Sequence, residues 1–130
     1  MITETKDVFE VAATDLVVTT YRRNFSSSQL EFQSPKARWT LTIEGAFDMT
    51  RNTGEESTST MPLLADLIGE SVLLLRARKA DGELELRFTH DWVLTVEADP
   101  EYEAWQLLSN RGDMLVAVPG NGIARWREET

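Results

Sequence analysis

The chain has 130 residues and a mass of 14.7 kDa, the size of one domain, so we expect residues 1–130 to form a single domain with one core. It contains no cysteine, which excludes disulfides, cysteine-bound zinc, iron–sulfur clusters and thiol catalysis. The 22 acidic and 13 basic residues give a net charge of −9, which argues against unaided binding of a nucleic-acid backbone.

The start of the chain shows no strong structural pattern. Residues 1–13 carry mixed charge and little hydrophobic periodicity, so we expect a loosely held start. They lack the positive and apolar regions of a secretory signal. The longest apolar runs, such as residues 72–75 and 114–118, fall far short of the roughly 20 residues that span a bilayer. We therefore expect a cytoplasmic protein that binds no membrane.

The first half of the chain predicts three strands. Residues 16–21 (LVVTTY) are rich in β-branched side chains, and residues 30–33 (LEFQ) follow a segment of turn-forming residues. In residues 39–44 (WTLTIE), apolar and polar side chains alternate. A period of two is typical of an antiparallel strand with one buried face.

A polar segment and a short helix are expected next. Residues 51–60 (RNTGEESTST) have low complexity and no aromatic side chain, which predicts a mobile loop. Proline favours the first position of a helix and glycine its end, so Pro62 and Gly69 predict a short helix near residues 62–68. The side chains that would pack inward from it are Leu63, Leu64 and Leu67.

The second half of the chain predicts six more strands. Asp81-Gly82 between two alternating runs is a strong hairpin signal. The segments predicted to be strands are SVLLLRARK (71–79), ELELRF (83–88), WVLTVE (92–97), EAWQLLS (103–109), DMLVAV (113–118) and IARW (123–126). We therefore expect a mainly β fold of about nine strands, with antiparallel sheets closed as a barrel or packed as a two-layer sandwich.

Two features of these strands bear on assembly. WTLTIE begins at Trp39 and WVLTVE at Trp92, and each follows a similar strand, LEF from Leu30 and LEL from Leu84. An internal duplication of a three-stranded unit and a chance similarity both explain this repetition. Residues 72–75 and 114–118 are apolar on both faces, so we expect the helix, a second sheet or another chain to cover them.

The C-terminal third resembles a known family. The segments LELRF, WVLTVEADPEYEAWQL and MLVAVPGNGIARW are similar to an uncharacterised family of small bacterial proteins of actinobacterial type. The shared features are a strand pair, an acidic D-P-x-Y-E-A-W segment and a terminal P-G-G-x-A-x-W hairpin. The resemblance is specific over residues 82–126 and looser over 14–80. Asn121 stands where the family hairpin carries glycine, and asparagine tolerates a positive φ. The resemblance implies no particular activity.

The sequence offers little for catalysis. His90 is the only histidine and lies beside Asp91 in a predicted turn. Neighbouring residues of a strand point to opposite faces, and no G-x-S-x-G motif supplies a nucleophile. The glycine patterns that cradle nucleotide phosphates are also absent. We predict no catalytic residue and no cofactor.

An acidic segment is the main candidate for binding. Glu97, Asp99, Glu101 and Glu103 alternate and would share one face of an extended segment, although Pro100 interrupts a regular strand. The segment has three interpretations: a solvated edge, a docking surface for a basic partner, and a calcium or magnesium site. Since no EF-hand pattern is present, we predict no metal.

Aromatic residues close to this segment extend the candidate site. Four tryptophans in a domain of this size are most often core residues. Clustered at one mouth of a barrel, Tyr102 and Trp105 could instead contact a ligand or partner. The residues predicted to bind are Glu97, Asp99, Glu101, Tyr102, Glu103 and Trp105.

Two hypotheses for function follow. The first is a non-catalytic protein-binding domain, of the immunity or assembly type, whose partner is a basic protein or a second copy of the chain. The net charge of −9 would steer it toward basic surfaces. The alternative is a small-molecule-binding β-barrel or an enzyme with a mouth lined by Tyr102, Trp105 and carboxylates. Because the inward faces read as continuous apolar residues, we favour the first hypothesis.

Overall fold

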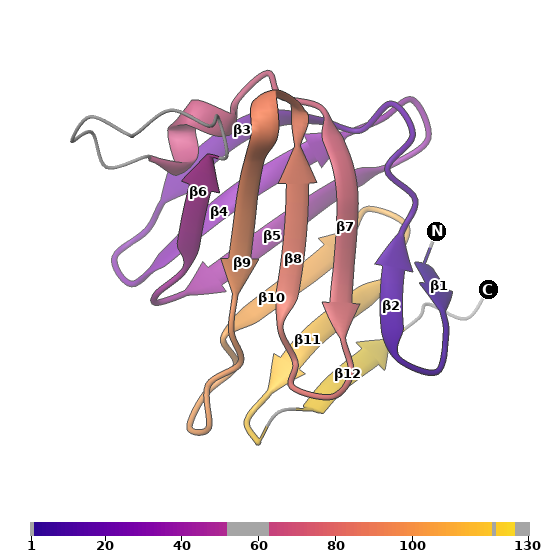
Figure 1. The fold of residues 1–130 in the computed structure, drawn as a ribbon, viewed down its shortest axis with the longest axis vertical. Helices are drawn as coiled ribbons and strands as arrows, with labels where there is room; N and C mark the ends of the chain where they lie inside the picture. The colour runs from indigo at the N-terminus through magenta and orange to yellow at the C-terminus, as the bar shows by residue number, and fades with distance from the viewer. Residues whose placement is uncertain (1, 52–62, 121, 127–130) are drawn as a thin grey trace.

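The computed structural model describes residues 2–51, 63–120 and 122–126, which form two six-stranded antiparallel sheets (Figure 1). Sheet 1 contains, in spatial order, β1 (Ile2–Glu4), β2 (Val8–Val11), β7 (Val72–Arg78), β8 (Leu84–Phe88), β9 (Trp92–Val96) and β6 (Asp48–Arg51). Sheet 2 contains β12 (Gly122–Trp126), β11 (Met114–Val118), β10 (Trp105–Ser109), β5 (Arg38–Glu44), β4 (Ser27–Gln33) and β3 (Val17–Arg23).

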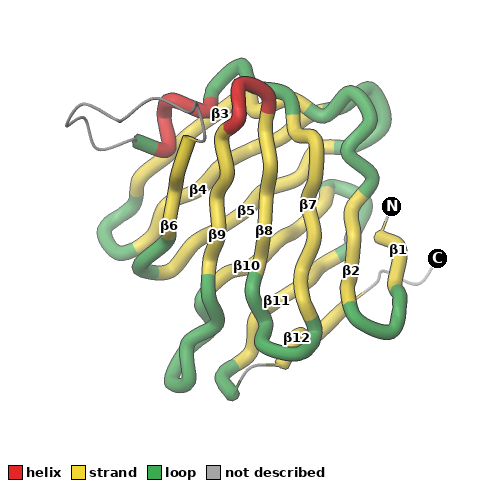
Figure 2. Tube along the Cα trace, in the orientation of Figure 1, coloured by secondary structure: helices red, strands yellow, loops and turns green. Residues whose placement is uncertain are grey.

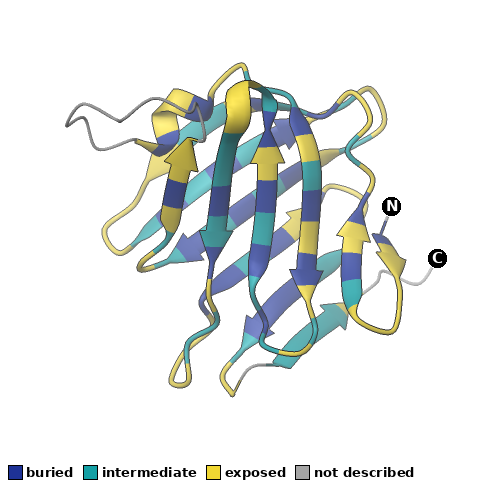
Figure 3. Ribbon diagram, viewed as in Figure 1, coloured by how far each residue is buried: buried dark blue, intermediate teal, exposed yellow. Residues whose placement is uncertain are grey.

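The sheets pack face to face as a sandwich and do not close into a barrel, which decides between the two predicted architectures (Figure 2). Side chains alternate between buried and exposed along most strands, as the period of two predicts (Figure 3). The buried faces meet in one core. Its largest fully buried side chains are Trp105, Phe32, Phe88, Leu16, Leu30, Leu41, Ile43, Leu67, Leu75, Leu84, Leu86 and Leu94.

The described residues contain twelve strands, and the three missing from the prediction of about nine are β1, β2 and β6. The first two lie in residues 1–13, where we expected a loosely held start. Instead β2 pairs with β7, and Phe9 is buried beneath Lys79, whose ammonium lies 4.8 Å from the ring centroid. Such short strands give too few residues to show a period. The predicted mobile loop 51–60 lies outside the described residues beyond Arg51, which ends β6.

The expected helix near residues 62–68 is a single 3₁₀ turn, η1 (Leu64–Leu67), in the part of the chain that the structure describes. The Leu63 N–H donates to Asp66 Oδ2 at 3.0 Å, which satisfies one free donor at the start of the turn. Leu64 and Leu67 are buried as predicted, but Leu63 is exposed. A turn of four residues presents one short face to the core, so it cannot bury all three leucines. The other 3₁₀ turn is η2 (Thr89–Asp91).

The repeated sequences predict two three-stranded units, which are the meanders β3–β4–β5 and β7–β8–β9. The two meanders share their pairing register. In β3–β4, Val18 lies opposite Phe32 and a bulge follows; in β7–β8, Val72 lies opposite Phe88 and a bulge follows. The two meanders thus have a bulge at the same place, as an internal duplication would produce. The register equates Phe32 with Phe88, so LEF corresponds to LRF (86–88) rather than to LEL (84–86).

In each sheet, the meander is extended by one more strand, and that strand follows the other meander in the sequence. After β5 the chain crosses to sheet 1, where β6 pairs with β9 and Met49 lies opposite Leu94. After β9 the chain crosses to sheet 2, where β10 pairs with β5 and Leu107 lies opposite Leu41. Leu41 and Leu94 are equivalent residues of the repeated strands. The two sheets therefore exchange strands symmetrically.

A bridge between the first strands of the meanders joins the two sheets. Val17 lies opposite Ser71 in an isolated antiparallel pair. The Val18 N–H donates to the Glu70 carbonyl at 2.9 Å, and the Val72 N–H donates to the Leu16 carbonyl at 2.8 Å. These bonds are reciprocal, since Val18 and Val72 are equivalent, as are Leu16 and Glu70.

The strands expected to be apolar on both faces differ from each other. In β11, Leu115 and Ala117 belong to the core, while Val116 faces outward yet is only 2% exposed. In β7, Leu73 lies at the bulge and is exposed. The expected cover on both faces therefore applies to β11 and not to all of β7.

Trp105 ties sheet 2 to the β7–β8 turn, and this contact yields a prediction. Its side chain is fully buried, and its Nε1–H donates to the Gly82 carbonyl at 2.9 Å. Trp105→Phe leaves a void and a buried carbonyl without its donor, so we expect the free energy of unfolding to fall by about 2–3 kcal/mol. Urea denaturation measures this change. Phe25→Ala, at a fully exposed side chain, should change stability by less than about 0.5 kcal/mol. Equal changes in the free energy of unfolding for the two substitutions would contradict the placement of Trp105 in the core.

Candidate functional site

A cleft of about 170 Å³ lies where the two crossovers between the sheets meet. One crossover is the turn from β5 to β6, and the other is the segment from β9 to β10. The Glu44 N–H donates to the Ala104 carbonyl at 2.9 Å, and Asp48 lies opposite Thr95, so backbone pairing holds the crossovers together. The residues that line the cleft are Glu44, Ala46, Phe47, Asp48, Thr95, Glu97, Ala98, Asp99, Tyr102 and Ala104.

Four carboxylates line this cleft, and no basic side chain does. Glu44 and Glu97 occupy equivalent positions in the repeated sequences. Asp48 begins β6, directly after the first crossover, and Asp99 lies in the second crossover. None of the ion pairs among the described residues includes any of the four. We name this feature the acidic cleft.

Some acids elsewhere in the described structure, such as Glu4 and Asp81, have cationic partners. Glu4 accepts a hydrogen bond from Lys79 Nζ at 2.7 Å, which lowers the pKa of Glu4. A hydrogen bond from Arg78 lowers the pKa of Asp81 in the same way. The acidic cleft lacks this compensation, so its negative potential stays available to a positive group from outside.

The acidic cleft does not form a metal site within the described residues. No group of three or more histidine or carboxylate side chains there is arranged to hold a metal ion. A calcium ion needs six to eight oxygen ligands that converge on one point. The four carboxylates are instead distributed along the lining of the cleft.

Tyr102 lines one side of the acidic cleft and is partly exposed. Its hydroxyl lies over Gly45, where a Cβ atom would stand 2.7 Å from the Tyr102 oxygen. Gly45 also has a φ of +105°, so glycine suits this turn for both reasons. The negative charge of Asp99 raises the pKa of Tyr102, with smaller contributions from burial, a hydrogen bond to Asp99 and the charge of Glu44. The phenol is therefore a neutral donor beside carboxylates.

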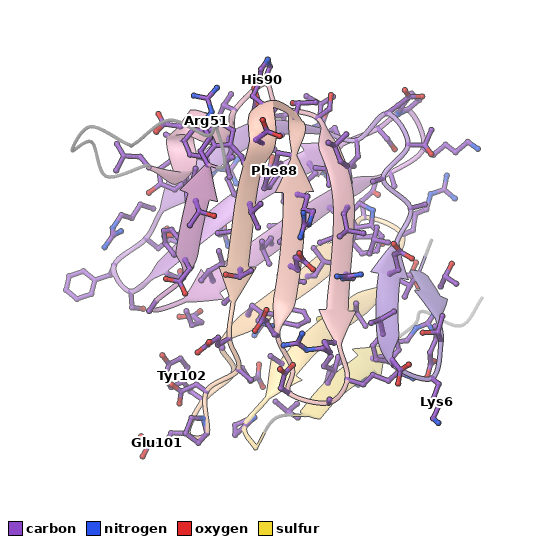
Figure 4. All side chains as sticks on the ribbon, viewed as in Figure 1. Lys6, Arg51, Phe88, His90, Glu101 and Tyr102 are labelled. Carbon is purple, nitrogen blue, oxygen red and sulfur yellow. The ribbon has the colours of Figure 1, made fainter. Side chains whose placement is uncertain are left out.

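The structure brings together three of the six residues predicted to bind: Glu97, Asp99 and Tyr102. The expected extended segment is instead a bend, in which Asp99 Oδ1 accepts from the Glu101 N–H at 2.8 Å. Alternate carboxylates therefore do not share one face. Figure 4 shows Glu101 and Tyr102 on the loop beyond β9.

The other predicted residues lie outside the acidic cleft. Glu101 is exposed and does not line it, and Glu103 accepts a hydrogen bond from Gln106 Nε2 at 2.8 Å. Trp105 is in the core, so it lines no mouth. The small-molecule alternative assumed a closed barrel with Trp105 at its mouth, and neither feature is present in the described structure.

Sequence reasoning missed the other wall of the acidic cleft. Glu44 ends β5, Phe47 lies in the turn that follows and Asp48 begins β6, about 50 residues before the acidic segment. Only the strand exchange brings the two segments together. The equivalence of Glu44 with Glu97 in the repeated sequences was the signal that could have linked them.

The only histidine is placed in a turn, as predicted, but with another partner. His90 Nδ1 lies 2.8 Å from a Glu70 carboxylate oxygen, and Thr89 Oγ1 donates to the same carboxylate at 3.1 Å. His90 and Asp91 both have positive φ values, 61° and 64°. The exposed imidazole thus joins η2 to Glu70, two residues before β7.

These features define a class: an antiparallel sandwich of two exchanged meanders, with an acidic cleft at the crossovers. The chain belongs to a family of unknown function, DUF6188, whose sequence profile matches residues 14–127. The match starts after β1 and β2 and includes both walls of the cleft. A search of curated proteins and a search of solved structures found no match. The described residues include no helix long and apolar enough to cross a bilayer.

The Tyr102 phenol provides a direct test of the electrostatics of the acidic cleft. Because the charge of Asp99 raises the pKa of Tyr102, Asp99→Asn should lower that pKa toward the ordinary value for tyrosine. Ultraviolet titration in a Tyr21→Phe background reports on Tyr102 alone, since the chain has two tyrosines. Glu101→Gln removes the same charge outside the lining and should have the smaller effect. A larger shift of the Tyr102 pKa for Glu101→Gln than for Asp99→Asn would contradict the placement of Asp99 beside Tyr102.

Proposed function

We propose that this chain is a non-catalytic protein-binding domain whose acidic cleft receives a positively charged side chain of a basic protein partner. The observation that carries the proposal is the set of four carboxylates, from the two crossovers and the strand ends beside them, around one cleft without a basic lining residue. An immunity-type protein that neutralises a basic enzyme, or an assembly subunit, would present such a surface. The proposal retains the cytoplasmic location predicted from the sequence.

The size of the cleft favours a single side chain as its occupant. Pockets for drug-sized ligands span about 300–1,000 Å³, whereas this cleft measures about 170 Å³. An arginine guanidinium has five donors in a planar fork, which suits carboxylates on two walls. The Tyr102 ring adds a face on which a guanidinium can stack. Arginine is therefore the occupant we expect.

The charge of the whole protein supports the same partner. A net charge of −9 attracts a basic protein over distances comparable to the Debye length, about 8 Å at physiological ionic strength. Steering of this kind raises association rates by about 10–10³-fold at low salt. Long-range attraction then brings the partner close, and the acidic cleft selects the side chain that enters.

A peptide titration tests this proposal. A short amidated peptide with two arginines is added to ¹⁵N-labelled protein, and amide shifts are followed by NMR. We expect saturable shifts at Gly45, Asp48 and Asp99 that weaken at about 0.5 M salt, because charge contacts are screened. A peptide with citrulline in place of arginine should produce none. Shifts spread evenly over the acidic surface would contradict a specific cleft.

Two matched double variants locate the binding. Asp48→Asn with Asp99→Asn removes two charges from the lining, and Glu101→Gln with Glu103→Gln removes two charges beside it. A charge-assisted hydrogen bond contributes about 1.5–3 kcal/mol, so we expect the first variant to weaken peptide binding at least about tenfold. The second should weaken it much less. Equal losses would favour a diffuse acidic edge over the cleft.

A further inference from the structure

An apolar patch lies on the outer face of sheet 2, separate from the acidic cleft. Leu107 and Leu115 point into the core, so their neighbours Leu108 and Met114 face outward. Leu108 lies opposite Met114, and Met114 lies opposite Trp126. Leu108 is 48% exposed and Trp126 is 50% exposed. We name Leu108, Met114 and Trp126 the outer patch; it crosses three strands and ends at β12.

The strand at that end, β12, is an edge strand, and the described sandwich has three others for comparison. Sheet edges invite pairing with another chain unless they are short, bulged or charged. β1 has three residues, and β6 has four, with Asp48 and Arg51 at its ends. β3 has a bulge and ends at Arg22 and Arg23. Each of these three edges therefore has a feature that discourages pairing with another chain.

The β12 edge lacks such protection within the described residues. All five of its residues pair with β11 without a bulge, and it contains no proline. Its only charged residue, Arg125, turns inward, 3.4 Å from a Glu4 oxygen and 5.9 Å from the Phe9 ring centroid. An unprotected edge beside exposed apolar side chains is typical of a pairing surface.

We propose that two copies of this chain associate through antiparallel pairing of their β12 strands about Ala124. This register sets Trp126 opposite Gly122 of the partner subunit, with both positions on the outer face. An aromatic side chain across from glycine covers backbone that glycine leaves open in a sheet. Ala124 meets its own copy, and no acidic side chain of β12 adds repulsion. The strand is thus complementary to itself.

The pairing also accounts for the outer patch. It joins the patches of the two subunits into one continuous apolar surface across a twelve-stranded sheet formed from two six-stranded ones. A two-fold interface of this kind closes on itself and uses up the open edge. Ala104 lines the acidic cleft and Leu108 belongs to the outer patch, so β10 separates the two surfaces. The dimer therefore leaves the cleft open.

Single-cysteine crosslinking tests the register, since the chain has no cysteine of its own. Cα atoms directly opposite in an antiparallel pair lie about 4.5–5.5 Å apart, within the range that a disulfide bridges. We expect Ala124→Cys to form a covalent dimer under mild oxidation at least about tenfold faster than Thr50→Cys, a control on the β6 edge. Equal rates would overturn the proposed register.

Sedimentation equilibrium tests the dimer without oxidation. We expect the unmodified protein to be a dimer at about 50 μM. Ala124→Lys places like charges opposite each other and should weaken association at least about tenfold, whereas Thr50→Lys adds the same charge on another edge and should not. A monomer at about 100 μM, or equal effects of the two lysines, would overturn the proposal.

Discussion

The exchange of strands between two meanders is the constraint on which the rest of this structure depends. β6 follows the first meander in sequence but completes the sheet of the second, and β10 does the reverse. Neither sheet can reach its full width until both meanders are in place. The reciprocal backbone bonds around Val17 and Ser71 join the meanders at their first strands. Folding of the two sheets is therefore coupled by topology as well as by the shared core.

The same exchange creates the acidic cleft. A chain that leaves β5 for the other sheet must cross the gap where the chain leaving β9 crosses in the opposite direction. The two crossovers then lie side by side, and the equivalent residues Glu44 and Glu97 contribute to one lining. Like charges that share one lining repel each other. Binding of a positive group, as proposed for this cleft, would offset that repulsion.

Much of the fold could be predicted from the sequence, because alternation reports directly on a strand with one buried face. WTLTIE and WVLTVE became β5 and β9, and Asp81-Gly82 preceded β8 as expected of a hairpin. The strands that were missed, β1, β2 and β6, have three or four residues each. The period of two cannot be distinguished from chance over such lengths.

The candidate site could be predicted only by half. Local sequence identified Glu97, Asp99 and Tyr102, but it treated the segment as extended and gave Glu101 and Glu103 equal weight. The hydrogen bond from the Glu101 N–H to Asp99 bends the chain and separates them. The wall formed by Glu44 and Asp48 depends on the pairing of β6 with β9, a long-range contact. The placement of Trp105 depended on which face of β10 is buried.

Differential capture from the native lysate tests whether the acidic cleft binds a basic protein. Wild-type protein, the Asp48→Asn/Asp99→Asn variant and the Glu101→Gln/Glu103→Gln variant are each used as bait, and captured proteins are quantified by mass at low salt and at about 0.5 M salt. We expect a stoichiometric basic protein that the wild type and the Glu101→Gln/Glu103→Gln variant retain at low salt and the Asp48→Asn/Asp99→Asn variant loses. Equal capture by all three baits would contradict the acidic cleft as the binding surface.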